Sequence, residues 1–212
     1  MSKTSLSSKD LLNTLAPVVP VADFTSIDHA KVCAQLFHEM SVPSVEVTIR
    51  RPEAWACVEE CKKNMPNASV GVGTVLEKDQ FHRAADLEVD FIISPGFLPS
   101  LAEYAQQFNL HYYPGISSAS DLMLAKSYGF SALKFFPAEA AGGISMLKSL
   151  YGPFPDISFC PTGGISLENY NGYLSSPNVL CVGSSAVVPK MSSLEENLEA
   201  CTEIIESVYG DS

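Results

Sequence analysis

The sequence has few of the features that mark metal proteins, nucleic-acid-binding proteins and membrane proteins. Its 13 Lys and Arg residues stand against 24 Asp and Glu, a net charge of −11, and they form no basic stripe of the kind that binds nucleic acid. The apolar runs are far shorter than the roughly 20 residues of a membrane helix. The first residues lack the apolar core of a signal peptide. We therefore expect a soluble, cytoplasmic protein with no nucleic-acid or membrane partner.

Cysteine and histidine are present, but not in metal-binding patterns. The 6 cysteines include no CxxC pair, and the 4 histidines form no HxH or HExxH cluster. Three of the histidines, His29, His38 and His82, fall in segments with the pattern of outer helices. We expect reduced thiols, and a mechanism that uses neither a metal nor another cofactor.

β-rich runs recur along the chain, separated by segments with helical patterning. They are PVVPVA, SVEVTI, SVGVGT, FIISP, HYYPG, ALKFF, SFCPTGG and VLCVGSS. This alternation predicts a parallel α/β sheet, and eight such units close most naturally as a (β/α)8 TIM barrel. We expect one domain over residues 1–212, with an extra N-terminal helix in SSKDLLNTLA. A flavodoxin-like open sheet, normally of about five or six strands, is the alternative.

Lys134 lies inside the apolar run ALKFF, with no carboxylate next to it in the sequence. Burial of an unpaired ammonium group is unfavourable, whereas the neutral amine of a lysine is the form that attacks carbonyl carbons. A lysine whose stem covers apolar surface while its ammonium group reaches water is the commoner case. Lys134 is therefore a candidate nucleophile only if other inward-facing groups support it.

The run SVEVTIR alternates between apolar and polar residues, which places Glu46, Thr48 and Arg50 on one face of a strand. Because parallel strands are buried on both faces, we expect this polar set to point inward, toward Lys134. A buried ion pair between Glu46 and Arg50, without chemistry, is the alternative. Two inward cations and one carboxylate balance only if the lysine is neutral or an anion binds, and both cases indicate a site.

Two glycine-rich turns, PTGGIS and VGSS, follow the last two predicted strands. Barrel enzymes often bind phosphate in the loops at these two places, through backbone N–H groups. Neither turn contains Lys or Arg, which fits recognition by amides. Glycines after a strand are also ordinary turn residues, so it is the pair of turns that indicates a phosphate site.

Several long motifs, taken in order, resemble those of the 2-keto-3-deoxy-6-phosphogluconate (KDPG) aldolase family, also called 4-hydroxy-2-oxoglutarate (KHG) aldolases. They are VVPV, VEVTIR, VGVGTV, ISPG, PGIS, KFFPAEAAGG, FCPTGGIS and VGSS. The resemblance implies a class I aldolase of the Entner–Doudoroff pathway, built on a barrel and assembled as a homotrimer. Such an enzyme cleaves KDPG into pyruvate and glyceraldehyde 3-phosphate, and KHG into pyruvate and glyoxylate.

The resemblance also implies roles for individual residues. Lys134 would form the Schiff base, and Glu46 would be the catalytic acid and base. The substrate-binding residues, from the pyruvyl end to the phosphate end, would be Arg50, Thr74, Pro95, Phe136, Thr162, Gly163, Gly164, Gly183, Ser184 and Ser185.

The chain departs from the family pattern at three positions. Ser184 stands where a second glycine is common, Ala186 where a tryptophan is frequent, and Arg51 where a threonine is usual. Thr162 carries the hydroxyl expected of the gluconate enzyme, whereas the related phosphogalactonate aldolases tend to have an apolar residue there.

Three other functions remain open at this point. One is a keto-acid aldolase of the phosphogalactonate type. Another is a sugar-phosphate isomerase or epimerase, in which Glu46 is the base and Lys134 acts only through its charge. The third is a phosphosugar-binding or assembly protein without activity.

Overall fold

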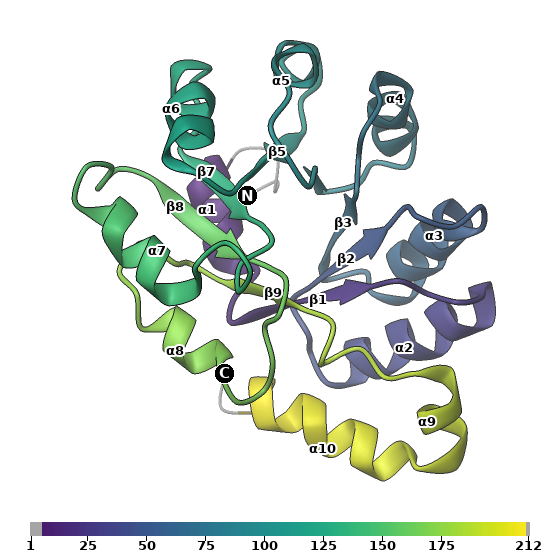
Figure 1. The fold of residues 1–212 in the computed structure, drawn as a ribbon. Helices are drawn as coiled ribbons and strands as arrows, with labels where there is room; N and C mark the ends of the chain where they lie inside the picture. Colours follow the sequence, from purple (N-terminus) through teal and green to yellow (C-terminus); the bar gives the residue numbers. More distant parts are fainter. Residues whose placement is uncertain (1–5, 211–212) are drawn as a thin grey trace.

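Parallel strands and the helices that connect them make up the structure, a computed structural model in which residues 6–210 are described. The strands are β1 Val18–Ala22, β2 Ser44–Thr48, β3 Ser69–Gly73, β4 Phe91–Ile93, β5 His111–Tyr113, β6 Gly115–Ile116, β7 Ala132–Phe135, β8 Ser158–Pro161 and β9 Val182–Ser184. The helices are α1 Ser8–Thr14, α2 Ile27–Glu39, α3 Ala54–Asn64, α4 Lys78–Asp86, α5 Pro99–Ala105, α6 Ala119–Ser127, α7 Gly143–Tyr151, α8 Tyr170–Leu174, α9 Met191–Glu196 and α10 Leu198–Tyr209. Apart from α1, the helices lie around the outside of the strands (Figure 1).

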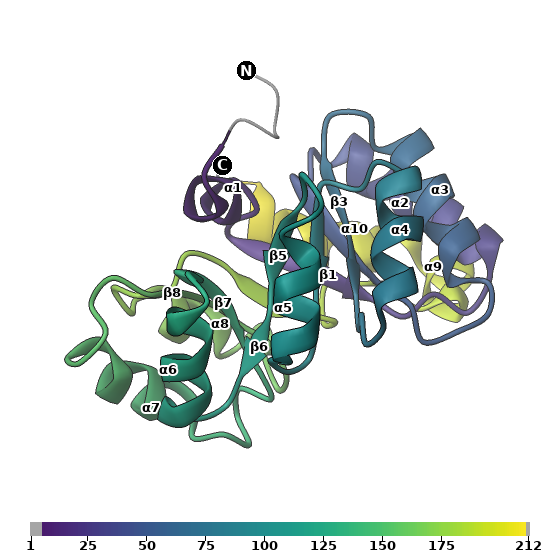
Figure 2. The same cartoon turned by 90° about the horizontal axis from the view of Figure 1, so that it is seen from above.

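The strands form two sheets. One has 6 strands in the order β5-β4-β3-β2-β1-β9, and the other has 3 strands in the order β6-β7-β8. The predicted closed (β/α)8 TIM barrel is therefore wrong: the larger sheet is a curled half-barrel, and a smaller sheet lies beside it (Figures 1 and 2).

The strands are interrupted at two places, between β5 and β6 and between β8 and β9. Pro114 separates β5 from β6, and proline has no N–H to donate to a ladder. Among the described residues, the segments of β8 and β9 form no continuous ladder and are joined by the isolated bridges Phe159–Val179 and Thr162–Gly183. The open-sheet alternative describes this arrangement better, although β1 to β5 here follow the chain order and β9 pairs with β1, unlike the strand order of a flavodoxin.

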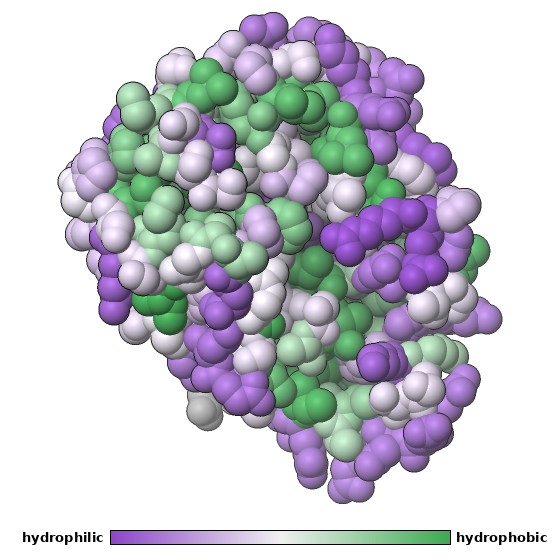
Figure 3. Space-filling view, viewed as in Figure 1, coloured by the Kyte–Doolittle hydropathy of each residue, from purple (hydrophilic) through white to green (hydrophobic). Residues whose placement is uncertain are grey.

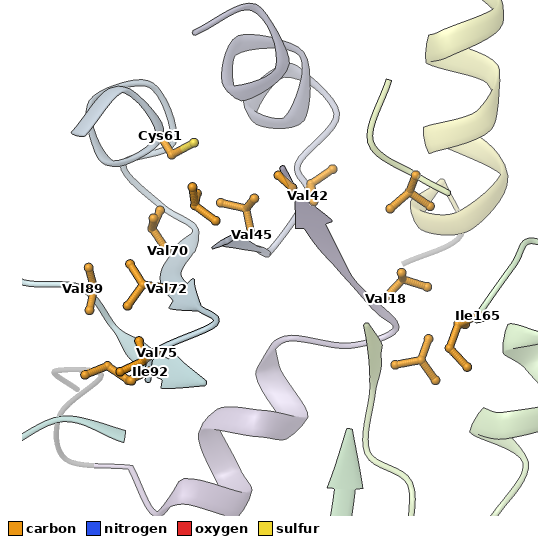
Figure 4. Close-up of a cluster of buried hydrophobic side chains, with 14 of the residues drawn as sticks. Val18, Val42, Val45, Cys61, Val70, Val72, Val75, Val89, Ile92 and Ile165 are labelled. Atoms are coloured by element: carbon orange, nitrogen blue, oxygen red, sulfur yellow. The ribbon is translucent and has the colours of Figure 1, made fainter. Parts of the chain in front are cut away.

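The main core lies between the strands of both sheets and the helices around them. Val45, Val70 and Val72 are buried there beside Cys61 of α3 and Val89 (Figure 4). Strands β2 and β3 are buried along their whole length. A polar side chain in one of these strands therefore has an apolar surrounding, and needs a specific partner.

The helix expected ahead of the first strand is present as α1. Its N-cap is Ser7, whose side chain accepts a hydrogen bond from the N–H of Asp10, an arrangement that satisfies a free backbone donor. Leu11 and Leu12 are buried in a second apolar cluster, which contains Phe91 and Tyr113 from the strands. Helix α1 thus covers the inner face of the strands rather than joining the outer helices.

All 6 cysteines are buried free thiols, as expected. Burial raises the pKa of Cys33 to about 12 and that of Cys57 to about 11, so both thiols are protonated at neutral pH. Over residues 6–210, His, Cys, Asp and Glu side chains form no group arranged to hold a metal ion. In the same part of the chain, no helix is long and apolar enough to cross a membrane.

Candidate active site

Lys134 and Glu46 form a buried ion pair. Nζ of Lys134, on β7, lies 3.1 Å from Oε1 of Glu46, on β2, and the two side chains are 7% and 1% exposed. The ammonium position is also 5.3 Å from the centre of the Phe136 ring. Two desolvated charges contribute little net stability, so the pair is better explained by chemistry than by folding.

The space for Glu46 comes from a neighbouring glycine. Gly73 faces Thr48 in the β2–β3 ladder, and a Cβ atom at Gly73 would lie 1.9 Å from Oε1 of Glu46. In the described part of the chain, the other carboxylate oxygen, Oε2, has no hydrogen-bond partner, and neither has Oγ1 of Thr162. Such groups are costly unless a ligand or water satisfies them.

Arg50 and Thr74 meet at the rim. Nε of Arg50 donates to Oγ1 of Thr74 over 3.3 Å. Thr74 has φ of 66°, a left-handed backbone that is unusual for a β-branched residue and that clusters at functional sites. Arg50 itself is exposed, so the expectation that it is a buried cation is wrong. Of the Asp, Glu, Lys and Arg residues in the described part of the chain, Lys134 and Glu46 are the buried ones, and they balance each other.

A cavity of about 620 Å³ is lined by Phe136, whose ring lies near Lys134, and by most of the residues expected at the substrate site, whereas Lys134 and Glu46 themselves are not among its lining residues. Of the expected residues it brings together Arg50, Phe136, Thr162, Gly163, Gly164, Gly183, Ser184 and Ser185. The space-filling view shows a hollow near the middle of one face, with strongly hydrophilic side chains along its margin (Figure 3). Pro95 lies elsewhere, in a separate cavity of about 180 Å³ next to Phe97 and Leu98.

The two glycine-rich turns lie side by side at the cavity. Gly163 and Gly164 have φ of 99° and 80°, values that only glycine adopts without strain. At Gly183, an added Cβ would lie 2.3 Å from Oγ1 of Thr162. The glycines therefore allow the two loops to approach each other closely.

Ser184 connects these loops. Its hydroxyl donates to the carbonyl oxygen of Ile165 over 2.7 Å and accepts from the N–H of Ala186 over 3.1 Å. The side chain is 4% exposed. Its hydrogen bonds hold the loop after β9 against the loop after β8, so the hydroxyl is already occupied within the protein.

Further residues line the cavity that sequence reasoning missed, among them Asp23, His29 and Lys190. His29 is 5% exposed; its Nδ1 accepts from the N–H of Thr25 over 3.3 Å, so Nε2 carries the proton and donates to the carbonyl oxygen of Pro189 over 2.8 Å. The placement of Asp23 directly after β1 was the available signal, since the carboxyl ends of parallel strands carry the site. For His29 and Lys190, on or before helices, the sequence held no such signal.

Comparison with known proteins identifies the family of the chain. The family model for KDPG and KHG aldolase matches residues 10–204, almost the whole chain. The chain belongs to the KDPG and KHG aldolase family. The resemblance inferred from the motifs is thereby confirmed, as is the enzyme class, a carbon–carbon lyase of the class I aldolases.

Individual family members agree with this. The KHG/KDPG aldolase of Escherichia coli K12 is 41% identical over 189 residues, which are 89% of this chain and 88% of that protein. The KDPG aldolase of Legionella pneumophila, solved with pyruvate captured as a covalent carbinolamine intermediate, has a TM-score of 0.88 at 37% identity, covering 96% of this chain and 98% of that one. The KDPG aldolase of Zymomonas mobilis ZM4, solved with 3-phosphoglycerate, has a TM-score of 0.88 at 35% identity, covering 96% of each chain.

Proposed function

We propose that this KDPG aldolase family member cleaves KDPG into pyruvate and glyceraldehyde 3-phosphate, and KHG into pyruvate and glyoxylate. The observation that carries the proposal is the 3.1 Å contact between Nζ of Lys134 and Oε1 of Glu46 in a buried setting. It brings an amine and a carboxylate together close to Thr48 and Phe136, which line a cavity large enough for a six-carbon keto acid phosphate.

The proposed reaction begins at Lys134. The Lys134 ammonium passes a proton to Glu46, and the resulting amine attacks the C2 carbonyl carbon of the substrate. Glu46 returns this proton to the hydroxyl of the carbinolamine, which leaves as water and gives an iminium ion. Glu46, directly or through a water molecule, takes the proton of the C4 hydroxyl. The C3–C4 bond then breaks, its electron pair moves toward the iminium, and the aldehyde leaves. General-base assistance of this kind typically contributes about 10²–10⁴-fold to the rate.

The second half of the reaction releases pyruvate. Protonated Glu46 returns its proton to C3 of the enamine, which regenerates an iminium ion, and water hydrolyses this to pyruvate and the free lysine. Oε2 of Glu46, which has no hydrogen-bond partner among the described residues, is the atom available for both transfers. In the proposal Arg50 and Thr74 bind the substrate carboxylate, because a guanidinium group pairs with both carboxylate oxygens at once.

The phosphate group would be bound at the turns after β8 and β9. Support comes from the left-handed Gly163 and Gly164 and from the closeness of Gly183 to Thr162. Backbone amides in such turns form anion-binding concavities. We also propose, from the family resemblance, that the enzyme is cytoplasmic and forms a homotrimer; sedimentation equilibrium would test the trimer directly.

A cleavage assay tests the proposed function. Purified enzyme is mixed with KDPG, its galactonate epimer or KHG, and pyruvate release is followed with lactate dehydrogenase and NADH. We expect saturable release from KDPG and KHG, with the higher kcat/KM for KDPG, because remote binding energy orients the reacting bond. Preference for the epimer would reassign the enzyme to the phosphogalactonate type. No pyruvate from any of the three would contradict the proposed function.

A further inference from the structure

The glycine turn after β8 is tied to the segment that follows Lys134. The N–H of Ala138 donates to the carbonyl oxygen of Thr162 over 2.8 Å, and the N–H of Glu139 donates to that of Gly163 over 3.1 Å. A Cβ atom at Gly163 would lie 3.3 Å from the Phe136 ring. The segment that follows Lys134 and the turn after β8 are therefore held together by backbone hydrogen bonds.

The Glu139 side chain lies against this turn. An added Cβ at Gly164 would be 2.6 Å from Cγ of Glu139 and 2.8 Å from its Cβ. Glycine at this position lets the Glu139 side chain touch the backbone of the turn, so a displacement of Glu139 would also displace the turn. Neither the cleavage mechanism nor the expected substrate-binding set uses Glu139.

Tyr173 fixes the Glu139 side chain. This tyrosine of α8 is 0% exposed, and its hydroxyl donates to Oε1 of Glu139. Burial raises the pKa of Tyr173, and the hydrogen bond to the Glu139 carboxylate raises it further. The hydroxyl thus keeps its proton and remains a donor at all physiological pH values.

A second side chain holds the other carbonyl of the turn. Nδ2 of Asn169 donates to the carbonyl oxygen of Gly164 over 3.0 Å, while its Oδ1 accepts from the N–H of Ser166 over 2.8 Å. With both glycine carbonyls bonded, the orientation of the turn's peptide planes is set by Glu139 and Asn169, which are not among the residues that line the cavity with Gly163 and Gly164.

We propose that Glu139 and Tyr173 are positioning residues that hold the Gly163–Gly164 turn at a fixed distance from Lys134, and thereby set the preference for a phosphorylated substrate. The inference rests on the proposed function, because it assigns phosphate to that turn. A substrate with a phosphate group has to reach both Lys134 and the turn, so a loosened turn weakens its binding. An unphosphorylated keto acid needs only the lysine end.

The test compares Tyr173→Phe, Glu139→Ala and Glu139→Gln with wild type, and uses Tyr151→Phe on the exposed surface of α7 as the matched control. The ratio of kcat/KM for KDPG to kcat/KM for KHG is measured, together with the Kd of inorganic phosphate by calorimetry. We expect the ratio to fall about tenfold in Tyr173→Phe and Glu139→Ala, through KM, and phosphate binding to weaken by a similar factor. Glu139→Gln keeps an acceptor for Tyr173 and should stay near wild type, as should Tyr151→Phe.

Three results would overturn the inference: equal losses on both substrates, an unchanged ratio, or a Glu139→Gln variant as impaired as Glu139→Ala. Failure of the proposed function gives a different pattern. If wild type shows no preference for KDPG, the titration with inorganic phosphate still decides the positioning role. Phosphate binding that is unchanged in Tyr173→Phe, or that is absent from wild type, also overturns the inference. Circular dichroism of each variant confirms that it is folded.

Discussion

Nζ of Lys134 lies 3.1 Å from Oε1 of Glu46, although the two residues belong to different sheets. Both residues are buried, and their strands, β2 and β7, do not pair with each other. The contact is therefore made across the interior, where parallel strands direct alternate side chains inward. An amine and a carboxylate held this way are the two groups to which we assign the Schiff-base and proton-transfer steps.

Replacing Glu46 with Gln removes the proton acceptor while preserving the shape of the side chain. We expect a folded enzyme whose kcat for KDPG falls by about 10²–10⁴-fold, with little change in KM. Steady-state kinetics with both substrates measures this. Glu59→Gln, on the exposed side of α3, is the matched control. A variant that only raised KM would make Glu46 a binding residue.

The Gly73→Ala substitution tests whether Gly73 makes room for Glu46. The new Cβ would lie 1.9 Å from Oε1 of Glu46, so the carboxylate has to move away from Lys134. We expect cleavage to fall by roughly the factor seen for Glu46→Gln, and the free energy of unfolding to fall by about 1–3 kcal/mol. Gly152→Ala, where the added Cβ has no neighbour within 4 Å, should change neither. Full activity in Gly73→Ala would contradict the packing argument.

Ser184→Gly removes the hydroxyl that connects the loops after β8 and β9. Because one internal hydrogen bond contributes about 1 kcal/mol net, we expect kcat/KM for KDPG to change by up to about tenfold. The value for KHG should stay nearly constant. Equal changes on both substrates would mean that these loops do not form the phosphate site.

The sequence predicted the run of parallel strands and that Glu46 and Lys134 both point inward. It did so because a polar residue inside a buried strand shows which face of that strand is turned toward the interior. It did not predict the division into two sheets, which depends on Pro114 and on pairing between distant strands. The exposure of Arg50 was also missed. This residue lies beyond the last residue of β2, where the alternation of a strand no longer holds. The contact of Tyr173 with Glu139 joins segments 34 residues apart, and no local pattern records it.

The buried thiols predict a loss of stability in alkaline solution. Burial, followed by the nearby Cys201, raises the pKa of Cys33 from 9.0 to about 12. The unfolded chain therefore releases this proton first, so the thiol's contribution is complete below pH 9 and is lost as pH rises toward 12. Above pH 9 the free energy of unfolding should fall by about 1.4 kcal/mol per pH unit for this thiol. Urea unfolding between pH 7 and 10.5 should show a shallower slope for Cys33→Ala than for wild type. Exposed Ser149→Ala should retain the wild-type slope, and identical slopes for all three would contradict the assignment.

The most direct measurement is covalent trapping at Lys134. Enzyme is incubated with pyruvate and sodium borohydride, and the intact mass and the peptide containing Lys134 are determined by mass spectrometry. A Schiff base at this residue predicts a stable pyruvate-derived adduct on Lys134 in wild type. The Lys134→Arg variant should show neither the adduct nor cleavage of KDPG, because its guanidinium remains protonated. An unchanged wild-type mass, or an adduct on another lysine, would contradict the account.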